Sequence, residues 1–202
     1  MKKIAIGMPI LIVLALMISA RLATPTRAVT APPDDTLQVL SESSLANALS
    51  IKDMVEQSDV IAVGSCTDTR SVWIDRTLVT LATVAVGETL KGPGASNITV
   101  VLPGGVDANR KFPVAMTYPG APQIQPGENV FLFLTADSDL GGYTVAGFSQ
   151  GKFSIITDED GEQVVSRDLT KTMLKSNNGV NRGSAKKTSL ASLKAEVKQN
   201  LR

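Results

Sequence analysis

The chain has 202 residues, 43% of them hydrophobic and only 4% aromatic, so aliphatic side chains must fill the core of roughly one domain. It has no histidine, which excludes Ser-His-Asp and Cys-His catalysis, and its single cysteine, Cys66, excludes an intrachain disulfide and a thiolate metal cluster. Four of the 20 basic residues lie at or before Arg27, so the rest of the chain is slightly acidic and nucleic acid is not an expected partner.

Residues 1–28 have the pattern of a secretory signal peptide. Lys2 and Lys3 precede an uncharged, mostly apolar run, and Thr26 and Ala28 supply the two small residues of a cleavage site. The alternative is an uncleaved N-terminal anchor, with a run at the short limit for crossing a bilayer. We therefore expect an exported protein, either secreted or in the cell envelope, whose membrane contact is confined to this segment if it is retained. A Pro- and Thr-containing linker is expected over 29–43.

The first ordered elements are expected to be helical. Leu45, Ala48 and Leu49 suggest a helical turn. A short helix follows, in which Ser50 can act as the N-cap and Asp53 lies in the first turn.

A series of strands comes next. Short apolar or period-two runs predict strands at 60–63, 77–86, 97–102, 129–134 and 143–148, with a polar break at 67–70. A final hairpin is expected from 152–156 and 163–165 about a turn at 158–161. Segment 106–126 is long, rich in Pro and Gly, and predicted to be irregular, which is typical of flexible or functional loops.

The C-terminal part is expected to be a polar linker, 171–188, followed by an amphipathic helix at 189–202. Leu190, Leu193, Val197 and Leu201 share one face of that helix. The whole pattern predicts a mainly β fold with flanking helices, and in particular a small OB-like antiparallel barrel over 44–170.

Three segments carry a resemblance to a known family. Ser58–Gly64, Val84–Gly92 and Pro126–Leu134 resemble strands of the netrin-type modules, whose best-known members are the tissue inhibitors of metalloproteinases. The chain also resembles exported bacterial proteins of no assigned function that carry similar Glu-Thr-Leu-Lys-Gly, Pro-Gly-Glu and Gln-Gly-Lys-Phe segments. The resemblance implies an OB-like barrel. The inhibitors chelate the protease zinc through an N-terminal cysteine, which this chain lacks, so only the fold is implied.

A partner is expected to contact either the long loop 106–126, which carries Tyr118, or the turn around Trp73, which Arg70 and Arg76 flank. An exposed Trp near Arg is typical of binding hot spots, while half-burial of the indole against the barrel is the alternative.

No residue pattern indicates a catalytic set, a metal site or a cofactor. Cys66 is expected to be a buried small side chain rather than a reactive thiol. The acidic turn at 158–161 does not fit an EF-hand. A Ser-Lys hydrolase remains open through Ser149/Lys152 or Ser184/Lys187.

These observations favour an exported, non-enzymatic binding module whose partner is an extracytoplasmic protein or a glycan. The alternatives are a cell-envelope hydrolase and a structural envelope component that docks through its C-terminal helix.

Overall fold

The computed structural model describes residues 43–202, so the expected leader and nearly all of the expected 29–43 linker lie outside the described residues. The described part is mainly β, as expected, and contains two helices. Neither helix is long and apolar enough to cross a membrane. The elements in chain order are β1 (Ser44–Asn47), α2 (Ile51–Gln57), β2 (Val60–Ile74), β3 (Thr77–Lys91), β4 (Asn97–Pro103), β5 (Gly105–Asp107), β6 (Val114–Met116), β7 (Asn129–Asp137), β8 (Gly142–Val145), β9 (Lys152–Thr157), β10 (Gln163–Asp168), β11 (Thr172–Ser176), β12 (Gly179–Arg182), β13 (Ala185–Ser189) and α3 (Leu190–Asn200).

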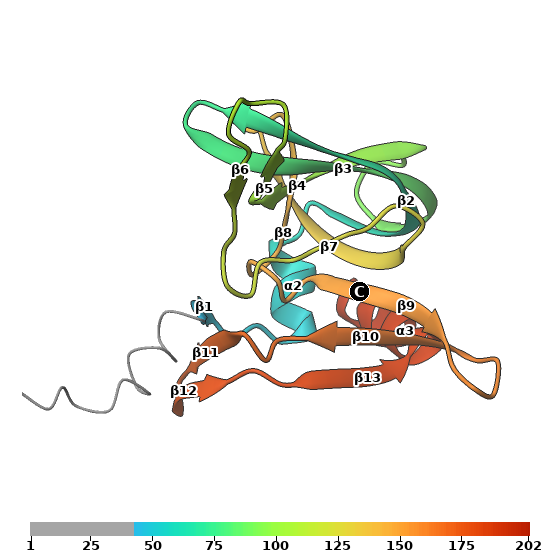
Figure 1. The fold of residues 1–202 in the computed structure, drawn as a ribbon. Coiled ribbons are helices and arrows are strands. Elements are labelled where there is room, and N and C mark those ends of the chain that lie inside the picture. The colour runs from blue at the N-terminus through green and yellow to red at the C-terminus, as the bar shows by residue number, and fades with distance from the viewer. Residues whose placement is uncertain (1–42) are drawn as a thin grey trace, which may run out of the picture. The chain divides into compact units, whose positions relative to one another are not determined.

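Eight of the strands pair in one sheet, in the order β13-β10-β9-β7-β2-β3-β4-β8, and β8 also pairs with β7 (Figure 1). Every ladder of this sheet is antiparallel except the short β4–β8 contact, which is parallel. Two smaller sheets, β1-β11-β12 and β5-β6, complete the described strands.

Strand β7 separates two hydrophobic cores, which explains why its sequence is an unbroken apolar run. Val130, Leu132 and Leu134 point into one core, together with side chains of β2, β3, β4 and β8. Phe131 and Phe133 point into the other core, together with side chains of α2, α3, β9 and β10. Because both faces of β7 are buried, neither face needs polar residues.

Both expected helices are present, and their first residues explain where they begin. Ser50 Oγ accepts a hydrogen bond from the Asp53 amide, and the Asp53 carboxylate accepts one from the Ser50 amide, which makes a capping box. Ser189 caps α3 in the same way by accepting from the Ser192 amide. Leu201 follows α3 and is 37% exposed, so the apolar face of the helix ends at Val197.

The helical turn expected from Leu45, Ala48 and Leu49 is wrong. Ser44–Asn47 forms strand β1, which pairs in parallel with β11, and Leu45 is 67% exposed. The apolar spacing suggested a helix, but pairing with a strand over a hundred residues away decides the backbone conformation.

Three other segments are more regular than expected. The polar residues at 67–70 continue β2, with a register shift between Cys66 and Asp68, because they lie on the long hairpin with β3 rather than in a break. Segment 106–126 contains most of β5 and all of β6. The expected linker at 171–188 contains β11, β12 and most of β13. β12 is exposed along its whole length, so no apolar period marks it as a strand.

The expected final hairpin is confirmed. β9 and β10 pair in antiparallel register about a turn in which Asp158 Oδ1 accepts hydrogen bonds from the amides of Asp160 and Glu162.

Candidate functional site

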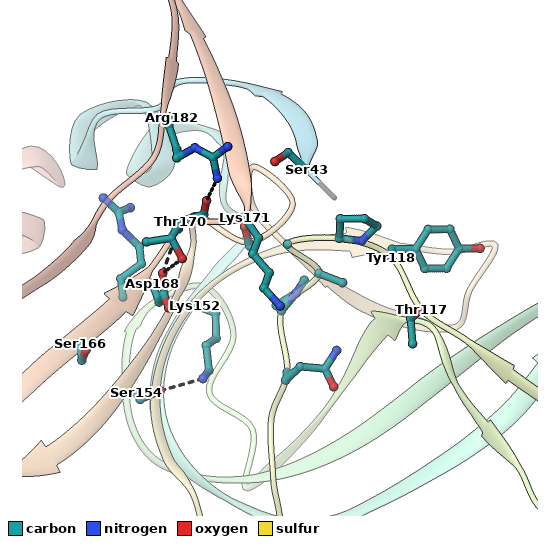
Figure 2. A pocket seen from close by; sticks show the side chains of 17 residues that line it. Ser43, Thr117, Tyr118, Lys152, Ser154, Ser166, Asp168, Thr170, Lys171 and Arg182 are labelled. Atoms are coloured by element: carbon teal, nitrogen blue, oxygen red, sulfur yellow. Dashed lines mark hydrogen bonds between the residues drawn. The ribbon is translucent and has the colours of Figure 1, made fainter. Parts of the chain in front are cut away.

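A cavity of about 1130 Å³ opens beside β9 and β10 and is the candidate ligand site, which we call the main cavity (Figure 2). One wall is the loop 117–123 between β6 and β7, and the other is made by β9, β10 and the turn that leads into β11. The lining residues are Ser43, Thr117, Tyr118, Pro119, Gly120, Ala121, Pro122, Gln123, Ser149, Lys152, Ser154, Ser166, Arg167, Asp168, Thr170, Lys171 and Arg182.

The loop wall is held against the start of β11 by a tight turn. The Ala121 amide donates to the Tyr118 carbonyl, and Gly120 has a φ of 69°. A Cβ at position 120 would lie 2.6 Å from Thr172 Oγ1 and 2.7 Å from the Lys171 carbonyl oxygen, so only glycine permits this approach. The turn at Tyr118–Ala121 therefore forms one wall of the main cavity.

The floor of the cavity contains an ion pair. Lys152 Nζ lies 2.6 Å from Glu128 Oε1 and donates to Ser154 Oγ at 2.7 Å, and Ser154 Oγ donates to the same carboxylate oxygen at 2.6 Å. Burial opposes ionisation of Glu128, but these hydrogen bonds, with one from the Gln125 amide, outweigh it and lower the pKa of Glu128. Lys152 is thus neutralised by a carboxylate at hydrogen-bonding distance.

Arg167 of β10 is held in place without a carboxylate. Its guanidinium lies over the Phe153 ring at 4.8 Å, and Nη1 donates to the Gln150 carbonyl at 2.8 Å. Nε is covered from solvent and has no hydrogen-bond partner among residues 43–202. Burial lowers the pKa of the Arg167 guanidinium, yet arginine keeps its charge in proteins. The guanidinium is therefore held on the side of β9 and β10 that carries Phe153, opposite the side on which Lys152, Ser154 and Ser166 line the cavity.

Two further cations belong to the turn and strand beyond β10. Lys171 extends into the cavity in Figure 2, and Arg182 Nη1 donates to the Thr170 carbonyl at 3.1 Å. Among residues 43–202, Asp168 is the only acidic lining residue, and its carboxylate accepts from the amide and hydroxyl of Thr170. These bonds are the main reason why the pKa of Asp168 is lowered, and Lys171 adds to the effect.

The structure places the predicted contact residues in two regions. Tyr118 lines the main cavity and is 40% exposed, whereas Trp73, Arg70 and Arg76 lie on the β2–β3 hairpin and do not line it. The indole of Trp73 is half-buried, as in the alternative interpretation, and donates to Asp107 Oδ2 at 2.7 Å.

Arg110 reinforces this contact, because its Nε bonds the same carboxylate oxygen at 2.9 Å and its guanidinium lies 4.6 Å from the indole centre. Trp73 therefore ties the β2–β3 hairpin to β5. A partner contact at this hairpin stays a prediction.

Sequence reasoning missed the basic residues of the main cavity. Arg167 lies in β10, a strand whose side chains alternate between the two faces in the usual way. Lys171 and Arg182 lie in the segment expected to be a linker. No local pattern distinguishes them from solvated surface residues, because their convergence depends on how β10, β11 and β12 are placed.

The Ser149/Lys152 pair does not have the geometry of a catalytic dyad. Ser149 Oγ lies 3.4 Å from Thr172 Oγ1, and Lys152 bonds Glu128 and Ser154 instead. Ser184 lies in the short connection between β12 and β13, outside the main cavity.

Cys66 is 1% exposed, as expected for a packed side chain, and burial raises the pKa of its thiol. Across the described part of the chain, 43–202, no three acidic or thiol side chains gather in an arrangement that would hold a metal ion.

Comparisons of the chain with protein-family models, with curated proteins and with solved structures find no match.

Proposed function

We propose that the chain is an exported, non-enzymatic binding module built on an OB-like barrel of the netrin type, with the main cavity as its ligand site. Export is inferred from the basic and apolar pattern of residues 1–28. The other two parts of the proposal are argued from the strand pairing and from the cavity.

The strand pairing supports the barrel. β2 pairs with β3, β3 with β4, β4 with β8, β8 with β7, and β7 with β2. Five strands linked in this cyclic order, around a core of their own, have the connectivity of a small Greek-key barrel of the OB type. Loops of such barrels commonly present ligand sites, although fold alone does not define a ligand.

The main cavity is the observation that carries the binding role. Ligand sites are concave, partly pre-formed and lined by a few convergent polar groups. Here the loop wall is fixed by the Tyr118–Ala121 turn, and the opposite wall is a hydrogen-bonded hairpin. A site of this kind binds without large rearrangement of the backbone.

The same geometry speaks against the hydrolase alternative. Lys152 bonds Glu128 and Ser154 rather than Ser149, the serine of the expected Ser149/Lys152 pair. A Ser-Lys mechanism needs the amine beside the hydroxyl whose proton it accepts.

A pair of matched substitutions tests the proposed function. Ala121 lines the main cavity, and Ala115 is an exposed residue of β6 outside it. We expect Ala121→Trp to fill the cavity and abolish crosslinking of the purified chain to its partner in envelope and culture fractions. Ala115→Trp, which adds the same side chain elsewhere, should leave capture intact. Equal capture by both variants, with unchanged thermal unfolding, would show that the cavity is not the binding site.

A further inference from the structure

Among residues 43–202, the lining of the main cavity carries more positive than negative charge. Glu128 neutralises Lys152, and no carboxylate in this part of the chain forms an ion pair with Lys171 or Arg182. Asp168 offsets one of these two charges. The surplus is local, because the chain beyond the expected leader is slightly acidic as a whole. Uncompensated cations that line one cavity favour a negatively charged ligand.

The remaining lining indicates what else the ligand carries. Thr117, Ser154, Ser166 and Thr170 add hydroxyl groups to the wall, and in the described part of the chain the exposed Tyr118 is the only aromatic lining residue. Single-stranded nucleic acids are usually bound by several stacking aromatics, which this cavity does not offer. Hydroxyl-rich walls with one exposed ring suit a ligand that itself has many hydroxyl groups and a weakly apolar ring face.

We propose that the main cavity binds an acidic glycan, with Lys171 and Arg182 contacting its carboxylate or sulfate groups and Tyr118 packing against a sugar ring. This assignment rests on the proposed function, since it names the ligand class of the same cavity.

The test uses the full chain and isothermal titration calorimetry with four probes. These are a galacturonic acid tetrasaccharide, a sulfated tetrasaccharide, a neutral galactose tetrasaccharide and a tetraglutamate peptide. We expect one or both acidic sugars to bind, with an affinity that falls as NaCl is raised, and the neutral sugar and the peptide to bind at least tenfold more weakly. Which acidic sugar binds more tightly identifies the oxyanion.

Matched variants locate the charge. Lys171→Met should weaken binding of the acidic sugar about tenfold, since a hydrogen bond to a charged group is worth roughly 1.5–3 kcal/mol and 1.4 kcal/mol is tenfold in affinity. Lys175→Met removes the same side chain from an exposed position of β11 outside the cavity and should leave affinity unchanged.

Three outcomes would overturn the inference. Equal losses in the two lysine variants would mean that the sugar binds elsewhere, and tetraglutamate binding as tightly as the sugars would assign the cavity to an acidic peptide. No binding of either acidic sugar would reject the ligand class. In each case the proposed function is judged separately, by partner capture with the Ala121→Trp and Ala115→Trp variants.

Discussion

Gln150 joins the N-terminal segment of the described chain to the turn between β8 and β9. Its side chain is 1% exposed, Oε1 accepts from the Leu49 amide at 2.9 Å, and Nε2 donates to the carbonyls of Asn47 at 2.7 Å and Gly147 at 3.1 Å. We predict that Gln150→Ala destabilises the fold strongly, because all three bonds are lost in an interior where water does not replace them.

The expected size follows from these contacts. A net contribution of about 1 kcal/mol per hydrogen bond gives roughly 3 kcal/mol, and the space left by the missing amide adds to it. We expect a loss of about 3–5 kcal/mol, a large part of the 5–15 kcal/mol that stabilises a typical domain. For a chain of this size the midpoint of thermal unfolding should fall by about 10 °C.

The control is Gln199→Ala on the exposed side of α3, where a change within about 0.5 kcal/mol is expected. Urea and thermal unfolding measure both variants. Amide hydrogen exchange adds a local readout, because the Leu49 amide should lose protection in Gln150→Ala. Equal unfolding midpoints for the two variants would refute the reasoning. A lower midpoint with the Leu49 amide still protected would assign the loss to packing rather than to the hydrogen bonds.

Three further predictions concern single groups. The pKa of Glu128 is lowered in the folded state, so its contribution to stability is present above about pH 4 and is lost as pH falls further. Glu128→Gln should therefore reduce how steeply the free energy of unfolding falls at acidic pH. An unchanged slope would contradict the ion pair with Lys152. Ser189→Ala should cost about 1 kcal/mol in urea unfolding through loss of the α3 cap, against no measurable change for the exposed Ser184→Ala. The buried Cys66 thiol, whose pKa is raised by burial, should react with a disulfide reagent only after denaturation, and rapid labelling of the native chain would show that its cover opens.

The sequence by itself determined the elements whose physical causes are local. Ser50 and Ser189 begin the two helices because their hydroxyl groups satisfy amides within three residues. Alternation of β-branched residues was enough to predict the centre of β3 as a strand, and the unbroken apolar run was enough to predict β7. Each of these signals lies within about ten neighbouring residues, so no knowledge of the rest of the chain is needed.

The tertiary structure alone decided the elements whose partners are distant. β1 is a strand because β11 is beside it, although the spacing around Leu45 suggested a helix. β12 and β13 carry polar residues on exposed edges, so they leave no apolar period to read.

The main cavity depends on the same kind of long-range information. Tyr118, Lys152, Arg167 and Arg182 come from four separate segments, and they line one space only after β10, β11 and the loop have been placed. A charged side chain has the same local signal whether it faces bulk water or a shared cavity. Convergence is therefore a property of the pairing of distant strands, which local sequence patterns do not encode.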